Sequence, residues 1–227
     1  MTTINLSKTP KVNLAKGQVV YLTKDGKSTS EHLTNVYFGA KWGSIIHTSR
    51  KGFWSKIFRS GESTVKNVDL DASLLLYDKH YELQDTVYYG KQISRDNAIV
   101  HSGDDRQGTQ GNEVEYDNET ISIDFTKINP NIKFIVAILN SYNHYTFDEI
   151  PYMKLRIYTG NIGDPDEVLC DYDVENNQSF INKEAIILGY FYKTEGAWKF
   201  KADGTTTQER SIKEIAYNSA KVVIKNL

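Results

Sequence analysis

The stretch VDLDASLLLY (residues 68–77) decides the fold, because it joins a polar start to an uninterrupted apolar run. Asp69 and Asp71 alternate with apolar residues, and side chains two positions apart point to the same face of a strand. From Leu74 onward every residue is apolar, which is typical of a strand that is covered on both faces. The stretch therefore predicts a buried strand that presents two carboxylates at one rim of a sheet.

A second apolar run, IKFIVAIL (residues 132–139), follows Pro130 and has the pattern of a central strand in a sandwich. Asp25-Gly26 predicts a tight turn that leads toward a return strand at 36–40, and residues 194–196 predict the turn of a late hairpin. The other predicted strands span residues 18–24, 36–40, 86–89, 121–125, 153–157, 186–193 and 197–201. Short strands at this spacing, separated by turn residues, predict an all-β fold, a β-sandwich of two packed sheets.

Oxygen-bearing side chains gather in HSGDDRQGTQGNEVEYDNETISIDF (residues 101–125). The first part is a turn that supplies carboxylate and carbonyl oxygens, and its residues are Ser102, Gly103, Asp104, Asp105 and Gly108. The oxygen-bearing triplet Asp117, Asn118 and Glu119 then runs directly into an alternating strand. Calcium takes about six to eight oxygen ligands with flexible geometry. We expect this loop to form one half of a site for a hard cation, and the two carboxylates of the 68–77 strand to form the other half.

Two segments depart from the strand pattern. In residues 44–66, the piece GFWSKIFRSG places large apolar side chains on one helical face with cations around them. An aromatic loop packed on the sandwich is favoured over a membrane contact, because so short a segment can bury such a face locally. The residues concerned are Phe53, Trp54, Ile57 and Phe58, with Lys51, Lys56 and Arg59. In the tail, residues 205–227, an apolar stripe predicts a helix docked on its own domain.

Composition limits the classes of partner. The chain has 227 residues, a formal net charge of −2 and one cysteine, Cys170. This charge gives no reason to expect nucleic acid or a membrane surface as the partner of the whole chain. A single cysteine excludes an internal disulfide and argues against a cysteine-based zinc site, which fits a reducing compartment. No secretion signal or membrane-spanning stretch is apparent, so we expect a soluble cytoplasmic protein.

Several segments, in the same order, resemble signatures of the TerD family, which is named for tellurite resistance. VDLDASLLLY resembles the family's DLDAS segment, HSGDDRQG (101–108) its HSGDN segment, and DNETISIDF (117–125) its DDE-plus-strand segment. VNLAKGQVVYL (12–22) is similar to its opening Leu-x-Lys-Gly segment, and MKLRIYTG, CDYDV and GYFYKTEGAWKFKADG follow its C-terminal half. The resemblance indicates a single TerD-like domain over 1–227, with an insertion at 44–66 and an extension at 205–227.

The resemblance implies a two-sheet sandwich that binds calcium through acidic loops and has no enzymatic activity. It implies a place among proteins linked to tellurite resistance, stress responses and defence against phage and colicins, and protein partners in such a complex. The metal ligands that it implies are Asp69, Asp71, Asp104, Asp105, Asp117, Asn118 and Glu119. The main-chain carbonyl of Gly108 is a further candidate, on loop geometry alone.

The sequence also departs from the family pattern. Asp105 stands where the family usually has Asn, which adds a negative charge to the loop. The family's Glu-Gly-Asp-Gly spacer is replaced by TQGNEVEY (109–116), so Glu113 and Glu115 become substitute ligand candidates. Gly43 stands where the family has Asp. Asp173, on the family's Tyr-Asp-Leu position, is either a ligand or a turn former.

The residues alone leave alternatives to a metal site. Acidic side chains commonly cap turns and solvate a rim. His101, Ser102 and Asp104 have the residue types of a hydrolase triad, although neighbours on one turn cannot easily take its three positions and no nucleophile elbow is visible. A zinc site at His101 lacks a second ligand at the right spacing, so a hydrogen-bonded histidine is favoured. A further alternative is a calcium-dependent adaptor that contacts a membrane or a partner through residues 51–59.

Overall fold

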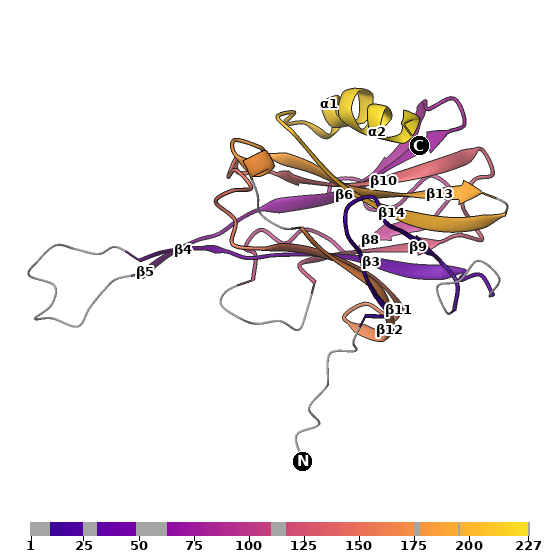
Figure 1. Ribbon diagram of the computed structural model, residues 1–227, viewed down its shortest axis with the longest axis horizontal. Coiled ribbons are helices and arrows are strands. Elements are labelled where there is room, and N and C mark those ends of the chain that lie inside the picture. Colours follow the sequence, from indigo (N-terminus) through magenta and orange to yellow (C-terminus); the bar gives the residue numbers. More distant parts are fainter. Residues whose placement is uncertain are drawn as a thin grey trace, which may run out of the picture.

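Two six-stranded β-sheets lie face to face in the computed structural model (Figure 1). The structure describes residues 10–24, 31–48, 63–109, 117–174, 178–194 and 196–226. The first sheet has the order β1 (Val12–Asn13), β12 (Asp164–Val174), β11 (Met153–Asn161), β3 (Asn35–Trp42), β9 (Glu119–Asp124), β8 (Ile99–His101). The second sheet has the order β2 (Val19–Tyr21), β14 (Ala197–Thr207), β13 (Ala185–Thr194), β10 (Ile132–Ser141), β6 (Leu70–Asp78), β7 (Leu83–Val87). The prediction of an all-β sandwich is confirmed.

The strand β6 carries the decisive stretch and pairs antiparallel with β10 inside the second sheet. Leu70, Ala72 and Leu74 of β6 belong to the core between the two sheets. Leu75 and Tyr77 belong to a second apolar cluster on the opposite face of the same sheet. Both faces of β6 are therefore covered, which explains why its sequence becomes apolar without alternation.

The second apolar cluster lies under the C-terminal helix, which covers the outer face of the second sheet (Figure 1). Ser211 caps this helix and forms a capping box with Glu214. The helix runs as α1 (Ile212–Ile215), a π-helical turn η3 (Ala216–Ala220) and α2 (Lys221–Lys225). The Tyr77 hydroxyl donates a hydrogen bond to the Ala216 carbonyl at 2.8 Å. The predicted tail helix is confirmed, and the π turn within it was not predicted.

The predicted pairing of segment 18–24 with segment 36–40 is wrong. The strand β2 pairs with β14 in the second sheet, whereas β3 pairs with β9 and β11 in the first. Within the described residues, a bridge between Thr23 and His32 joins the first segment to the chain that precedes the second. The predicted Asp25-Gly26 turn lies outside the described residues. An apolar pattern specifies a strand but not the sheet that it joins, and here the chain crosses between the layers.

The predicted insertion contains strands that its sequence did not indicate. The strands β4 (Ile45–Thr48) and β5 (Ser63–Lys66) pair with each other and form a separate two-stranded ribbon. This ribbon extends away from the sandwich (Figure 1). The amphipathic segment 51–59 lies outside the described residues. The strand β12 was also missed, because its acidic first half and Pro165 hide the pattern of its apolar second half.

Candidate metal centre

Three carboxylates converge where β6 begins. Asp69 precedes β6, Asp71 is its second residue, and Asp104 comes from the loop that follows β8. One carboxylate oxygen of each residue lies within 4.8 Å of the corresponding oxygens of the other two. Asp71 is 2% exposed and Asp69 is 9% exposed. Of the predicted ligands, the structure therefore brings Asp104, from the loop after a strand of the first sheet, together with Asp69 and Asp71 at the start of a strand of the second sheet.

Burial and neighbouring negative charges destabilise the charged forms of Asp69 and Asp71. Burial, followed by the charges of Glu119 and Asp69, raises the pKa of Asp71 to about 7. Burial, followed by the charge of Asp104, raises the pKa of Asp69 to about 6. Water and nearby cations do not compensate the negative charges of these two carboxylates fully. Both groups therefore keep their protons to unusually high pH.

Three oxygen atoms beside the start of β6 are buried and have no hydrogen-bond partner among the described residues, and they are Oδ1 of Asp69, Oδ1 of Asn140 and Oγ of Ser141. The amide nitrogen of Asn140 approaches Asp71 Oδ2 at 3.4 Å, so the Asn140 side chain belongs to the same site. A buried polar atom without a partner costs about 1 to 3 kcal/mol. A positive ion beside these oxygens would remove that cost. Sequence reasoning missed Asn140, whose only signal is a polar residue that ends an apolar strand.

Glu119 links the two sheets beside this site. Its Oε2 accepts the Ala72 amide proton at 2.7 Å, which joins β9 of the first sheet to β6 of the second. His101 Nδ1 accepts the Gly103 amide proton at 3.0 Å, so the ring proton lies on Nε2. This nitrogen faces the Ala72 carbonyl at 3.1 Å and Glu119 Oε2 at 3.3 Å. The interpretation of His101 as a hydrogen-bonded histidine agrees with this geometry.

Asp105 and Asn118 hold the loop together through their side chains. Asn118 Oδ1 accepts the Trp42 amide proton at 2.9 Å, and its Nδ2 donates to Asp105 Oδ2 at 2.8 Å. Asp105 Oδ1 accepts the Gln107 amide proton at 2.9 Å. These oxygens already have hydrogen-bond donors inside the loop. The metal roles that the family resemblance implies for these two residues stay predictions.

Gly108 allows the loop to pass close to a buried tryptophan. It has a φ of +70°, and a Cβ atom at this position would lie 3.0 Å from Cδ1 of the Trp42 ring. The Trp42 Nε1 donates to the Val68 carbonyl at 2.9 Å, next to Asp69. Trp42 thus connects the end of β3 to the start of the acidic strand. The sequence indicated Gly108 only as a source of a carbonyl oxygen, and its packing role was not predicted.

Asp117 is paired with a cation from another strand. Arg156 of β11 donates from Nε to Asp117 Oδ1 at 2.8 Å. Burial raises the pKa of Asp117, and the charges of Arg156 and then Lys41 oppose that rise. The sequence placed Arg156 in the predicted strand at 153–157, and nothing in it pointed to this partner.

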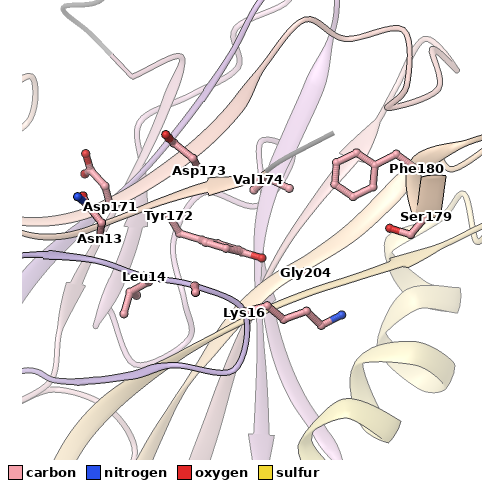
Figure 2. A pocket seen from close by; sticks show the side chains of 11 residues that line it. Asn13, Leu14, Lys16, Asp171, Tyr172, Asp173, Val174, Ser179, Phe180 and Gly204 are labelled. Atoms are coloured by element: carbon pink, nitrogen blue, oxygen red, sulfur yellow. The ribbon is translucent and has the colours of Figure 1, made fainter. Parts of the chain in front are cut away.

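The remaining candidates lie elsewhere or outside the described residues. Glu113 and Glu115 belong to the undescribed segment 110–116. Asp173 pairs with Lys154 at 3.0 Å and, with Asp171, lies on one side of a cavity of about 470 Å³ (Figure 2). Phe180 and Ser179 lie on the opposite side of this cavity.

The hydrolase geometry does not occur at His101. One ring nitrogen of His101 accepts from Gly103 and the other faces Ala72 and Glu119, while the Ser102 hydroxyl accepts the Thr120 amide proton at 3.0 Å. A triad needs the histidine beside the nucleophilic hydroxyl. The arrangement at this end of the sandwich is instead an acidic, oxygen-rich cluster of the kind that holds hard cations.

The fold and this cluster define a two-sheet β-sandwich with an acidic centre at one end. The TerD domain family model matches residues 11–218, and the chain belongs to this family. The tellurium resistance protein TerZ of Serratia marcescens is 26% identical over 94% of this chain and 100% of that protein. The stress response protein SCP2 of Bacillus subtilis is 28% identical over 90% of this chain and 96% of that protein. Relatives of this chain are thus named for resistance and stress response.

Two solved structures share the fold. A homologue of the telluride resistance protein (TerD) from Streptomyces coelicolor A3(2) matches with a TM-score of 0.54 and 16% identity, over 81% of this chain and 95% of that chain. The protein of unknown function SAV2460 matches with a TM-score of 0.57 and 17% identity, over the same shares of the two chains. Among the described residues, no helix is both long and apolar enough to cross a membrane.

Removal of the link between the sheets should destabilise the protein. In Glu119→Ala, the buried Ala72 amide loses its acceptor and a cavity opens, so we expect the free energy of unfolding to fall by about 2 to 4 kcal/mol. Glu82→Ala is the matched control, because Glu82 forms an exposed ion pair with Lys221 and such pairs contribute about 0 to 1 kcal/mol. Urea unfolding of both variants measures the difference. Equal losses in the two variants would contradict the role of Glu119.

Proposed function

We propose that this chain is a calcium-binding, non-catalytic member of the stress and tellurium-resistance family that acts as an interaction module. The observation that carries the proposal is the convergence of Asp69, Asp71 and Asp104, together with the unpartnered, buried Oδ1 of Asp69. Turn-capping carboxylates would be exposed and hydrogen-bonded to main-chain amides. Asp69 and Asp71 are buried, repel each other and leave an oxygen without a donor.

The donor set favours calcium over transition metals. The cluster offers oxygens, which are the ligands of hard cations, whereas zinc prefers nitrogen and sulfur. Both ring nitrogens of His101 already face other groups. The Cys170 thiol is buried in the core, where burial raises its pKa to about 12. Magnesium requires near-ideal octahedral geometry and keeps several waters, whereas calcium accepts a flexible set of carboxylates and carbonyls.

Asp69, Asp71 and Asp104 would hold the ion, which supplies the positive charge that offsets their mutual repulsion. Asp104 lies on the loop after β8, whereas Asp69 and Asp71 lie at the start of β6. Shared coordination would fix this loop against the second sheet, so the free energy of binding becomes conformational stability. A surface ordered in this way suits recognition of protein partners, and the names of the relatives direct the proposal to stress response and tellurium resistance. We place this role in the cytoplasm as part of the same proposal.

A second candidate function is a calcium-dependent adaptor that contacts an anionic membrane. The observation that favours it is the ribbon of β4 and β5, which extends from the sandwich and pairs Ile46 with Val65 (Figure 1). These side chains are 53% and 42% exposed. The segment between the two strands contains the apolar and cationic residues 51–59, a composition that suits a membrane interface.

Calcium should raise the melting temperature of chelator-treated protein by roughly 5–10 °C at about 100 times its dissociation constant, because ligand binding at this ratio contributes about 2.7 kcal/mol. Magnesium should raise it less. In Asp71→Asn the calcium response should disappear, while the melting temperature in chelator should rise because one of the repelling charges is gone. Asp164→Asn, at an exposed carboxylate, is the matched control and should behave like the wild type. An unchanged wild-type melting temperature at millimolar calcium would refute the proposal.

Calcium affinity should depend on pH through the raised carboxyl pKa values. The pKa values of Asp69 and Asp71 in the folded chain, about 6 and 7, lie above the ordinary value of 3.8. Between pH 3.8 and these raised values, the folded chain therefore retains protons that the unfolded chain has lost. The stability that these groups contribute without metal is therefore present at low pH and is lost as the pH rises toward 7. Calcium requires the ionised groups, so its dissociation constant should be about tenfold or more weaker at pH 5.5 than at pH 7.5. Calorimetric titration at both pH values measures this, and equal affinities would contradict the assignment of these ligands.

The adaptor candidate predicts calcium-dependent co-sedimentation with vesicles that contain phosphatidylserine. Ile46→Ser with Val65→Ser should reduce the bound fraction several-fold, because the apolar surface of the ribbon is lost. Ile162→Ser is the matched control, since Ile162 is a similarly exposed residue in the turn between β11 and β12. Absence of binding by the wild type, or an equal loss in the control, would exclude the ribbon as a membrane contact.

A further inference from the structure

The returning end of the acidic loop is anchored by a fixed cation. Asp117 is the first residue of the triplet that leads into β9, and its side chain is 4% exposed. Its Oδ1 accepts a hydrogen bond from Arg156 Nε at 2.8 Å. Hydrogen bonds between two charged groups are stronger than neutral ones, and breaking such a buried pair leaves a charge without compensation. The protein itself thus supplies a cation to Asp117 through Oδ1, although Oδ2 of Asp117 and Nη2 of Arg156 have no hydrogen-bond partner among the described residues.

The backbone of β3 makes room for this carboxylate. Gly39 pairs directly with Arg156 across β3 and β11. A Cβ atom at Gly39 would lie 2.2 Å from Asp117 Oδ2, well inside van der Waals contact. The Asp117 carboxylate thus lies over the main chain of the first sheet, in a space that only glycine leaves open. Its position follows from the first sheet and does not depend on the cluster at β6.

Aromatic packing holds Arg156 in place. The Arg156 Cζ lies 4.9 Å from the centroid of the Tyr158 ring, and Tyr158 stacks on Tyr37 with 5.3 Å between ring centroids. Only 20% of the Arg156 side chain is exposed, whereas Arg106, which pairs with Asp104, is 77% exposed. The cation at Asp104 can leave for water at little cost, and the cation at Asp117 cannot. The two ends of the loop are therefore neutralised in different ways.

We propose that Arg156 is a permanent counter-cation and positioning residue for the acidic loop, and that Asp117 is its counter-ion rather than a calcium ligand. The part of this inference that concerns calcium rests on the proposed function. Arg156 holds the returning end of the loop on the first sheet. The amide of Asn118, the next residue, donates to the Ala40 carbonyl at 2.9 Å and continues this attachment. The calcium ligand that the loop contributes is then Asp104, at its outgoing end, and it joins Asp69 and Asp71 of the second sheet.

The test compares Asp117→Asn, Arg156→Gln and the double variant with the wild type, and uses Asp71→Asn as the variant that loses a ligand. Calorimetry and native mass spectrometry measure the calcium affinity and the number of ions bound. We expect Asp117→Asn to keep the wild-type number of ions and a dissociation constant within threefold of the wild type. Arg156→Gln should bind one additional ion at millimolar calcium, because a buried carboxylate has lost its cation, and the double variant should return to the wild-type number.

Melting in chelator tests the pair without reference to calcium. Each single variant should lower the melting temperature. In the double variant, the melting temperature should regain at least half of the decrease that Arg156→Gln alone causes. Loss of calcium binding in Asp117→Asn to the same degree as in Asp71→Asn would overturn the inference, as would an unchanged ion number in Arg156→Gln. If Arg156→Gln does not fold, Asp117→Asn alone decides. If the wild type binds no calcium, the proposed function fails. The melting temperature of the double variant in chelator then still decides whether the pair of Arg156 and Asp117 holds the loop on the first sheet.

Discussion

The hydrogen bond from the Ala72 amide to the buried Glu119 carboxylate fixes the end of the sandwich on which the acidic site depends. It joins a strand of one sheet to a strand of the other, so it sets how the sheets lie along each other at this end. Asp71 precedes Ala72, and the loop that carries Asp104 leads toward Glu119. A shift of β6 by one residue would leave the amide without an acceptor and would also turn Asp71 to the other face. One constraint thus aligns the sheets and places the carboxylates.

The repulsion among Asp69, Asp71 and Asp104 is tolerated because the rest of the fold supplies the stability. The strand β6 is packed by the first sheet on one face and by the C-terminal helix on the other. Such double coverage buries large aliphatic side chains, each of which contributes about 1.5 to 3 kcal/mol. The charges lie at the start of the strand, where they do not interrupt this packing. A site that opposes stability locally is typical of a functional region.

Local patterns in the sequence were sufficient for the strands that are covered on both faces, whereas the expectation that Asp104 meets Asp69 and Asp71 drew on the family resemblance as well. The apolar runs that became β6 and β10, and the strand β13, were predicted at nearly their observed positions, whereas only the first half of β14 was predicted. The assignment of β2 and β3 to different sheets could not be predicted, because it depends on distant partners. The same reason hid the pair of Asp117 and Arg156, which exists only because β3 and β11 are neighbours in a particular register. Ligand types can be read from a sequence, whereas the partners that already satisfy them cannot.

The loop illustrates why a count of carboxylates overstates the charge that is available to a metal. Asp117 is neutralised by a buried arginine, and Asp105 accepts hydrogen bonds from Gln107 and Asn118. Oδ1 of Asp69 has no hydrogen-bond partner among the described residues, Asp71 accepts one long hydrogen bond from Asn140 at 3.4 Å, and burial raises the pKa values of these two groups to about 6 and 7. The difference lies in the cation, because burial also raises the pKa of Asp117 but the charge of Arg156 opposes that rise. A carboxylate that has lost water without gaining such a cation favours the uptake of either a proton or a metal ion. The chemistry of this end of the sandwich is therefore concentrated at the carboxylates that the fold itself leaves uncompensated.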